Sequence, residues 1–194
     1  MPNFIMIICV TGQSGVGKTT ILNLLSKKYY VEFLDNLIHT EYKVNNQGYN
    51  LIKEHFGIKY VDSNKVNRKK LGQLVFSDKH LLNKLNNILE PLIIKIILNI
   101  KKKYKNSLVL VEGGAILNNF EKYANLFDKF ILIKAPKKFI KENNNIKFAH
   151  IDNDIYKYLK VNISNSFFDL IILNNKSPEL CAKKIEIFLN KLKK

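Results

Sequence analysis

The chain has 194 residues, 46% of them hydrophobic, and a formal net charge of +16 at pH 7. This hydrophobic content is enough for one ordinary core, so we expect a single domain. Because Lys and Asn interrupt the apolar stretches before they reach roughly 20 residues, the sequence excludes a membrane-spanning helix. The segment Met1 to Val10 lacks the basic start and the cleavage site of a signal peptide, and we therefore expect a cytoplasmic protein.

The positive charge is nearly all lysine, since Arg68 is the only arginine in the sequence. Proteins that read nucleic acids favour arginine, whose planar guanidinium makes paired contacts with bases and phosphates. The composition therefore argues against a nucleic-acid partner, whereas a positive surface suits anionic substrates such as ATP. The cysteines, Cys9 and Cys181, lie on separate apolar segments without metal-type spacing, and we expect both to be packing residues.

The first predicted element is a buried strand, the continuous apolar run from Phe4 to Val10. Apolar residues at helical spacing then predict a helix from Gly17 to Tyr29, followed by a second strand from Val31 to Leu34. Helical patterns continue around residues 36–43 and 49–56.

Further helices are predicted in the middle of the chain. The polar residues Asp62-Ser63-Asn64 indicate a break, and a new helical pattern runs from Asn67 to Phe76. The stretch from Leu81 to Lys103 is strongly helical. Because proline lacks an N–H donor and clashes with the preceding turn, we expect Pro91 to end one helix and to open another at Glu90. The sequence thus predicts a helical insert between two strands.

Three more strands are predicted, over residues 108–111, 130–133 and 170–173. The segment from Lys137 to Ile151 is rich in Lys and Asn, and we expect a surface loop or a mobile flap there. Ser177-Pro178-Glu179 predicts the start of a last helix, with a capping hydroxyl, a proline in the first turn and an acid near the positive helix end. Strands that alternate with helices imply a parallel sheet covered on both faces.

One motif carries clear chemistry. The residues Gly12-Gln13-Ser14-Gly15-Val16-Gly17-Lys18-Thr19, with Thr20 next, lie between the first strand and its helix. The glycines allow backbone angles that a side chain forbids, so successive N–H groups point at phosphate oxygens, assisted by the positive end of the helix. Lys18 is placed to reach the β- and γ-phosphates, and the Thr19 hydroxyl to hold Mg²⁺. We interpret the motif as a P-loop that binds ATP.

P-loops occur in switches, motors, helicases and kinases alike. A GTPase needs Asn-Lys-x-Asp to read guanine, and the nearest candidate, Asn175-Lys176-Ser177-Pro178, has proline in place of the acid. A motor or helicase usually needs a longer chain and an acid at a strand end. Glu112 is a candidate for that acid, or for a contact to Mg²⁺ through water. A helical insert and a Lys-rich flap suit a small-molecule kinase, in which closure keeps water from the phosphoryl group.

Several segments beyond the P-loop keep an order and spacing that resemble a known family. They are Asp35-Asn36-Leu37-Ile38-His39, Gly48, Ile52, Phe56-Gly57, Asp62, Arg68, Leu71, Val75-Phe76 and the stretch from Leu89 to Ile93. Together they resemble the dephospho-coenzyme A kinase family, from Ile7 to about Ile133 and again from Asp169 to Asn175.

The resemblance implies a three-layer α/β P-loop kinase fold. Its core would be a parallel five-stranded sheet with helices on both faces, and a helical substrate-binding insert and a lid would complete it. The boundaries that we expect are a core of residues 1–35, 105–136 and 168–194, an acceptor-binding insert of about residues 36–104, and a lid of about residues 137–160.

The resemblance also implies a reaction, the transfer of the γ-phosphoryl group of ATP to the ribose 3′-hydroxyl of dephospho-coenzyme A with the help of Mg²⁺. Asp35 matches the family's catalytic aspartate, at the end of the second strand and facing the phosphate loop, where it would accept or orient the hydroxyl proton while Lys18 offsets charge. An ordinary helix cap is its alternative role. Arg68 matches an arginine of the insert and would bind an anionic part of the acceptor; its alternative role is that of a solvated residue at a helix start.

The sequence departs from the family pattern at four places. Phe33 and Glu90 stand where the family commonly has an acid and a histidine, Gly113-Gly114-Ala115-Ile116 replaces a Pro-Leu-Leu stretch, and the expected lid has Lys137, Lys138, Lys141 and Lys147 but no arginine. Two alternatives therefore stay open: a kinase for another small molecule, nucleoside or nucleotide, and a P-loop ATPase associated with nucleic acid.

Overall fold

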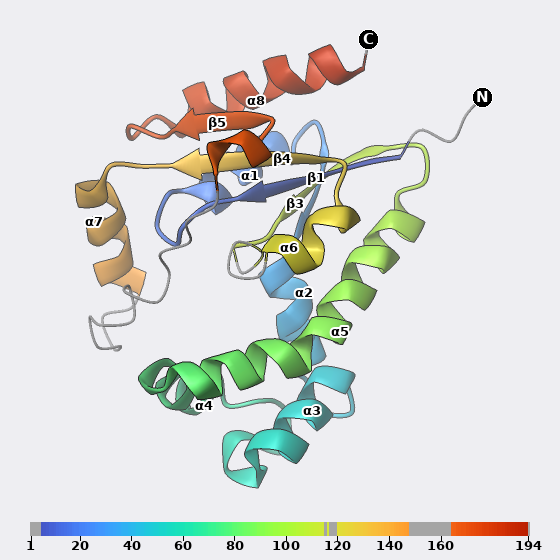
Figure 1. Cartoon of the computed structure of the whole chain (residues 1–194), viewed down its shortest axis with the longest axis vertical. Helices are drawn as coiled ribbons and strands as arrows, with labels where there is room; N and C mark the ends of the chain where they lie inside the picture. The colour runs from blue at the N-terminus through green and yellow to red at the C-terminus, as the bar shows by residue number, and fades with distance from the viewer. Residues whose placement is uncertain (1–4, 115, 117–119, 148–163, 194) are drawn as a thin grey trace. The chain divides into compact units, whose positions relative to one another are not determined.

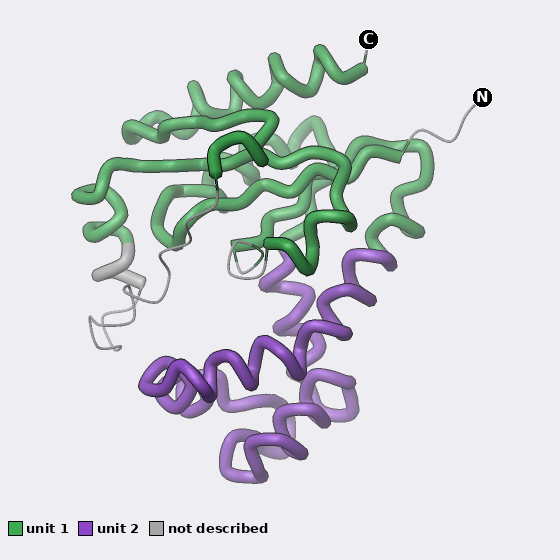
Figure 2. The backbone as a smooth tube through the Cα atoms, viewed as in Figure 1, with its two compact units in different colours: residues 1–33, 100–150, 161–194 green, residues 34–99, 151–160 purple. Residues whose placement is uncertain are grey.

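The structure is a computed structural model that describes residues 5–114, 116, 120–147 and 164–193 (Figure 1). Backbone contacts divide the chain into two compact units (Figure 2). Unit 1 comprises residues 1–33, 100–150 and 161–194, and unit 2 comprises residues 34–99 and 151–160. Unit 1 contains the sheet, and unit 2 is built from helices.

Unit 1 is organised around a parallel sheet. In the part of the chain that the structure describes, the sheet has five strands: β1 (Met6–Thr11), β2 (Tyr30–Phe33), β3 (Leu108–Glu112), β4 (Lys129–Lys134) and β5 (Leu170–Leu173). Their order is β2-β3-β1-β4-β5, and all neighbours run parallel. The predicted five-stranded parallel sheet is confirmed, and β1 lies at its centre, buried on both faces.

Helices α1 (Lys18–Leu25) and α8 (Pro178–Leu192) cover one face of the sheet (Figure 1). The two helices and the strands share one apolar core, formed by Ile21, Leu22, Leu25, Cys181, Ala182, Ile185 and Leu189 from the helices and by Ile8, Val10, Leu110, Ile131, Ile133 and Ile172 from the strands. This core fixes α1 behind the loop that follows β1.

A second layer covers the opposite face, because successive side chains of a strand point to opposite faces. There the ring of Phe120, from α6 (Phe120–Tyr123), lies 4.8 Å from that of Phe130 on β4, and Phe127 follows the short 3₁₀ helix η3 (Ala124–Leu126). Cys9 is fully buried in β1, and Cys181 is nearly so, both as free thiols. The predicted three-layer α/β fold and the packing role of both cysteines are confirmed.

Unit 2 contains α2 (Leu34–Glu41), α3 (Gln47–Phe56), the short 3₁₀ helix η1 (Ile58–Tyr60), α4 (Arg68–Ser77) and most of α5 (Lys79–Lys103). The start of α3 approaches the end of α2 closely, since a Cβ on Gly48 would lie 2.8 Å from the carbonyl oxygen of Glu41. The predicted break at Asp62 is a turn, in which the Asp62 carboxylate accepts hydrogen bonds from the amides of Asn64 and Lys65.

The prediction that Pro91 divides two helices is wrong, because α5 continues through it as one helix of 25 residues. Leu89, Leu92 and Ile93 on either side of the proline are buried. Burying a side chain of this size stabilises the folded protein by about 1.5–3 kcal/mol. The three together therefore outweigh the destabilisation of about 3 kcal/mol that a proline causes inside a helix. Despite the length of α5, no helix in the described part of the chain is long and apolar enough to cross a membrane.

Three other local predictions need correction. The segment expected to be a loop or flap begins as a helix, α7 (Lys137–Lys147), anchored by Ile140, whose amide donates to the Pro136 carbonyl and whose side chain packs on the core of unit 1. The helix predicted to reach Tyr29 ends at Leu25. Ser177 does precede the first turn of α8, but its hydroxyl makes no capping hydrogen bond.

Candidate active site

The P-loop lies at the centre of the sheet, where β1 ends at Thr11 and α1 begins at Lys18. β1 pairs with β3 on one side and with β4 on the other. The strands that follow it in the chain therefore lie on both sides of it, and β1 marks the point where the strand order changes direction. In parallel sheets, ligands bind outside the carboxyl ends of the strands at such a point. The motif found in the sequence therefore occupies the position where this fold binds ligands.

The backbone of the P-loop depends on glycine. Gly15 and Gly17 have φ angles of 82° and 91°, in the left-handed region that disfavours residues with a Cβ. A Cβ on Gly12 would collide with the carbonyl oxygen of Ile133 on β4. These positions let the loop turn tightly and end at Gly17, where the N–H groups of the first turn of α1 face out of the helix.

Lys18 is buried at the base of the loop, with 7% of its surface exposed. Its ammonium donates hydrogen bonds to the carbonyls of Gly12 at 2.8 Å and Gln13 at 3.2 Å. It also lies 3.8 Å from the carboxylate of Glu112. The loop thus holds one fixed positive charge against its own backbone, which is the arrangement expected of a lysine that neutralises phosphate.

Glu112 ends β3 and faces the start of α1. Its carboxylate accepts a long hydrogen bond of 3.5 Å from the Thr19 hydroxyl, and both groups adjoin Lys18. Burial raises the pKa of Cys9, the neighbouring thiol on β1, with the Lys18 charge opposing the rise and the Glu112 charge adding to it.

Among the described residues no cluster of three or more His, Cys, Asp or Glu side chains could hold a metal. Thr19 and Glu112 do fit Mg²⁺, which prefers oxygen ligands and usually keeps waters and substrate phosphates in its shell.

Two asparagines that the sequence did not single out support the P-loop. Asn174, only 2% exposed, donates from Nδ2 to the Val16 carbonyl at 2.9 Å. Asn143 of α7 donates to the Gly15 carbonyl at 2.7 Å. Asn174 directly follows β5, and the carboxyl ends of parallel strands lie at the same edge of the sheet, so the sequence could have indicated that Asn174 lies near the P-loop. Asn143 lies in an Asn-rich segment, and nothing in the sequence distinguishes it from its neighbours.

Asp35 lies in unit 2, in the first turn of α2, and its side chain is exposed. The prediction that it ends the second strand is wrong, because β2 stops at Phe33 and α2 begins directly at Leu34. Asp35 is therefore not a residue that precedes and caps the helix. Its charge lies near the positive end of α2, where an acidic residue stabilises the helix.

Arg68 is the first residue of α4 and is also exposed. Within unit 2, Arg68 and Asp35 both lie near enough to Tyr42, a buried residue just after α2, for their charges to act on its phenol. Burial raises the pKa of the Tyr42 phenol to about 12, while the Arg68 charge lowers it and the Asp35 charge raises it. The backbone strengthens this arrangement, since the Tyr42 carbonyl accepts a 2.9 Å hydrogen bond from Val66, two residues before Arg68.

The departures from the family pattern fall at distinct places. Phe33 pairs with Glu112 in the sheet, which places it beside the acid of the P-loop site. Glu90 lies within α5 and is half-buried. Lys137, Lys138 and Lys141 are exposed on α7. The side chain of Lys147 and the remainder of the expected lid, residues 148–160, lie outside the described residues.

Comparison with known proteins gives a consistent result. A family model described as dephospho-CoA kinase matches residues 6–179, which is most of the chain. A dephospho-CoA kinase of Mycoplasma genitalium is 39% identical over 137 residues, covering 70% of this chain and 69% of the relative. A dephospho-CoA kinase of Mycoplasma pneumoniae is 31% identical over 191 residues, covering 97% of this chain and 94% of the relative.

A solved structure agrees with the fold. The dephospho-CoA kinase from Campylobacter jejuni superposes with a TM-score of 0.59 and 24% identity, covering 98% of this chain and 100% of the other. At that identity the likeness supports the fold alone. The sequence relatives and the family model carry the family assignment, and the match to the model includes the P-loop, Asp35 and Arg68.

Proposed function

The chain belongs to the dephospho-CoA kinase family, and from that premise we propose that it transfers the γ-phosphoryl group of ATP to the ribose 3′-hydroxyl of dephospho-CoA. The products are coenzyme A and ADP, which makes the reaction a step of coenzyme A synthesis. The observation that carries the proposal is the P-loop with its buried Lys18 and neighbouring Glu112. A cytoplasmic location goes with it, since ATP is the donor.

The donor side of the reaction is built in unit 1. Backbone N–H groups of the loop and of the first turn of α1 bind the phosphates, and the Lys18 ammonium stabilises the charge on the β- and γ-oxygens. The Gly12 and Gln13 carbonyls hold the Lys18 ammonium at the base of the loop. The side chain therefore needs little reorganisation to exchange these hydrogen bonds for bonds to phosphate oxygens. The oxygens of Thr19 and Glu112 would hold Mg²⁺, which when bound offsets the charge of the polyphosphate.

The acceptor side is proposed to use Asp35. Its carboxylate accepts the proton of the acceptor hydroxyl as the oxygen–phosphorus bond forms and the bond to the β-phosphate oxygen breaks. The chain itself supports this assignment, because Asp35 follows Phe33 by two residues and Phe33 pairs with Glu112 of the P-loop site. Two residues span at most about 7 Å of extended chain, so the backbone of Asp35 starts close to that strand end.

Arg68 is proposed to bind an anionic group of the acceptor. A guanidinium pairs with phosphate through two parallel hydrogen bonds, which fixes orientation as well as charge. The described side chains of unit 2 support this role, because Arg68 and Asp35 act on the same Tyr42 phenol. We propose that an acceptor anchored at Arg68 presents its hydroxyl to Asp35.

We propose that α7 begins the lid. Asn143 connects this helix to the P-loop through Gly15, and Glu142 pairs with Lys176 of the loop after β5 at 3.4 Å. Exposed lysines on the same helix add positive charge near the phosphate site. A lid of this kind excludes water, so that the phosphoryl group passes to the acceptor and is not hydrolysed.

The direct test is an assay of the purified protein with Mg-ATP and dephospho-CoA, in which ADP formation and the mass of the acceptor are followed. We expect ADP to form only with the acceptor present, and the acceptor to gain one phosphate group. Turnover that does not depend on dephospho-CoA would reject the proposal. A panel of AMP, dTMP, CMP, uridine and pantothenate in the same assay tests the alternative of another small-molecule kinase.

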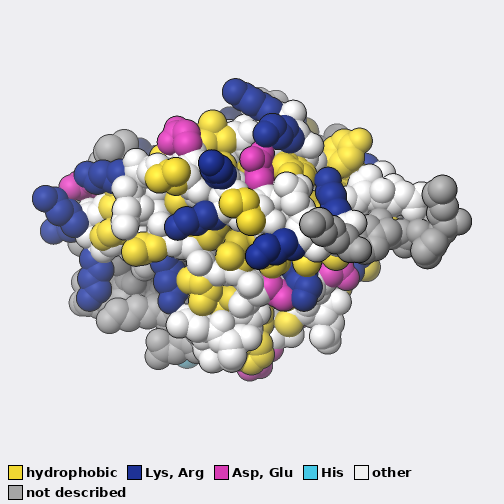
Figure 3. All heavy atoms as spheres, turned by 90° about the horizontal axis from the view of Figure 1, so that it is seen from above, with side chains coloured by type: hydrophobic (Ala, Val, Ile, Leu, Met, Phe, Trp, Pro, Cys, Tyr) yellow, Lys and Arg dark blue, Asp and Glu magenta, His cyan; other side chains and the backbone are white. Residues whose placement is uncertain are grey.

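The same assay tests the alternative of a nucleic-acid-associated ATPase. That alternative predicts that ATP hydrolysis rises when single-stranded DNA or RNA is added, whereas we expect no change. The molecular face in Figure 3 supports our expectation, because its Lys and Arg side chains are interspersed with hydrophobic and acidic ones and do not form one continuous stripe. Nucleic-acid-binding surfaces cluster such charges on one face or along a helix.

A further inference from the structure

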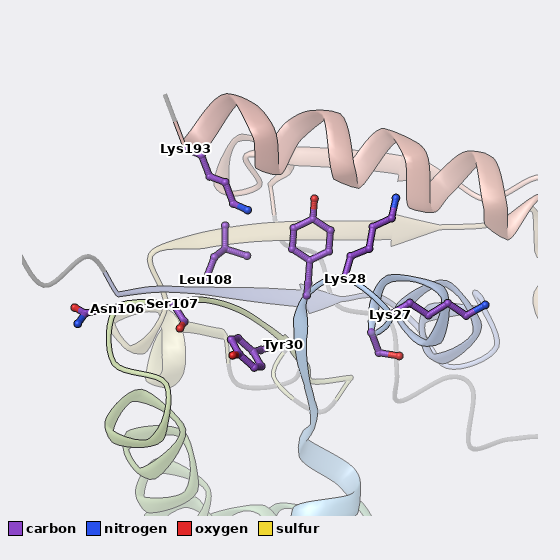
Figure 4. Close-up of a pocket in the computed structure, with 9 residues that line it drawn as sticks. Lys27, Lys28, Tyr30, Asn106, Ser107, Leu108 and Lys193 are labelled. Carbon is purple, nitrogen blue, oxygen red and sulfur yellow. The ribbon is translucent and has the colours of Figure 1, made fainter.

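A second cavity in unit 1 lies away from the P-loop, where strands β2 and β3 begin (Figure 4). Its volume is about 550 Å³, within the range of roughly 300–1,000 Å³ typical of small-molecule sites. Three separate segments line it: the connection from α1 to β2, the connection from α5 to β3, and the end of α8. Since all five strands run parallel, this end of the sheet is opposite to the end where Thr11 leads into the P-loop.

The cavity is positively charged. Lys27, Lys28 and Lys193 line it, and none of the described residues that line it is acidic. Glu186 of α8 pairs with Lys28 at 3.0 Å and offsets one charge, while Lys27 and Lys193 are exposed. Lys193, at the end of α8, holds its ammonium 5.2 Å from the centre of the Tyr29 ring, and Figure 4 shows that Lys27 points away from Lys193 in this conformation. Several like charges around one concave surface raise the local positive potential, which an anion relieves.

Aromatic and polar groups accompany the lysines. Tyr30 is 55% exposed, and one side of its ring is supported by Tyr104, whose ring centre lies 4.9 Å away. Tyr104 is itself fixed, because its hydroxyl donates a hydrogen bond to Glu32. Asn106 and Ser107 add amide and hydroxyl groups to the wall. An exposed ring that is held from one side offers the other side for stacking.

We propose that this cavity is a second anion-binding site, which takes a small phosphorylated molecule with a planar ring, such as a mononucleotide. Lys27 and Lys193 bind the phosphate, and their four-carbon stems allow both ammonium groups to turn toward it. Tyr30 stacks on the ring, and Asn106, whose side chain points away from Tyr30 in Figure 4, would rotate to hydrogen-bond the polar edge of that ring. The site is separate from the catalytic P-loop and does not depend on which acceptor the enzyme phosphorylates.

The test uses a tryptophan reporter, because the chain has no tryptophan of its own. Tyr30→Trp in the full-length protein places a single fluorescent ring in the cavity, on an edge strand that accepts aromatic residues well. AMP is titrated as the probe, and saturable quenching of the reporter is expected. Inorganic pyrophosphate should displace AMP and reverse the quenching, whereas adenosine, which has no phosphate, should bind more weakly by about tenfold or more.

Charge reversal shows which groups hold the phosphate. Lys27→Glu and Lys193→Glu in the reporter background should each weaken AMP binding by about tenfold. Lys183→Glu, on the exposed side of α8 and outside the cavity, is the matched control and should leave the titration unchanged. Lys18→Ala, which disables the P-loop, should also leave the titration unchanged.

Three results would overturn the site: no saturable quenching, quenching that pyrophosphate does not reverse, or quenching that Lys27→Glu and Lys193→Glu leave intact. Loss of the signal in Lys18→Ala would instead show that AMP acts through the P-loop, which also contradicts a second site. Because the readout is local to Trp at position 30, failure here is distinguishable from failure of the kinase assay.

Discussion

The two units of this protein support function in contrasting ways. In unit 1 the site is made of backbone and buried charge: Lys18 is 7% exposed and bonded to loop carbonyls, and Glu112 is 8% exposed beside it. In unit 2 the proposed site residues Asp35 and Arg68 are both exposed, and their charges shift the pKa of the buried Tyr42 in opposite directions. The proposed nucleotide site is thus fixed by the fold, whereas the proposed acceptor site depends on a few exposed side chains.

This difference indicates how the two halves of the reaction tolerate change. A loop built from left-handed glycines and a crowded Gly12 permits few substitutions, because nearly any side chain would collide or strain the backbone. An exposed arginine or aspartate can be replaced without disturbing the core of its unit. Substitutions in unit 1 should therefore impair nucleotide binding, and those in unit 2 should impair use of the acceptor.

The largest effect is expected for Lys18→Ala. Removal of the buried ammonium should weaken ATP binding by about tenfold or more and lower kcat/KM by about 10⁴-fold, since the charge acts on the phosphoryl group in the transition state. Isothermal titration with Mg-ATP and steady-state kinetics measure the two effects. Lys183→Ala, an exposed lysine on α8, is the control; equal losses in both variants would contradict a specific role for Lys18.

Asp35→Asn should separate the two units most clearly. The variant keeps the shape of the side chain but cannot accept the hydroxyl proton, so kcat should fall by about 10³-fold while the Kd of ATP stays the same. Asp78→Asn is a matched control, an exposed acid of unit 2 at the start of α5. Near-normal turnover of Asp35→Asn would show that the residue only stabilises the start of α2.

Arg68→Lys should have a smaller effect. Lysine keeps the charge but loses the planar pair of donors, so the KM for dephospho-CoA should rise by about tenfold with a smaller change in kcat. The control is Lys69→Ala, which removes the neighbouring exposed charge. If both variants raise the acceptor KM alike, the contribution of Arg68 is general positive charge and not a specific contact.

Tyr42→Phe should have the smallest effect on activity, a rise of about threefold in the acceptor KM from loss of one polar group between Arg68 and Asp35. Its clearer readout is alkaline stability. Since the folded pKa of about 12 lies above the ordinary value of 10.0, the wild type loses stability as pH rises from about 10 toward 12. Denaturant unfolding across that range should show less loss in Tyr42→Phe; identical profiles would contradict the assignment.

The features that could be predicted from the sequence are the local ones. A buried strand, the glycine loop and a helix are adjacent in the chain, so the P-loop and the positions of Lys18 and Thr19 within it could be predicted without tertiary contacts. The five strands were equally readable from short apolar runs. Their order was not, because it depends on pairings such as that of β1 with β3, about a hundred residues apart.

The failures have a common cause in packing. Pro91 remains inside α5 because buried Leu89 and Leu92 stabilise the helix on both sides of it, and α7 is helical because Ile140 packs on the core. Asn143 and Asn174 support the P-loop through hydrogen bonds to residues more than a hundred positions away. Local sequence pattern indicates at most that Asn174 follows a strand and so lies at the edge of the sheet; it does not indicate which residue either asparagine contacts.

The most direct measurement of the central claim is the position of the transferred phosphate. Phosphorus NMR of the acceptor after reaction with Mg-ATP should show one new phosphomonoester on the ribose 3′-hydroxyl of dephospho-CoA, formed by the wild type and not by Asp35→Asn. A phosphate at any other position, or inorganic phosphate as the main product, would contradict an enzyme in which the P-loop delivers the γ-phosphoryl group to an acceptor activated by Asp35.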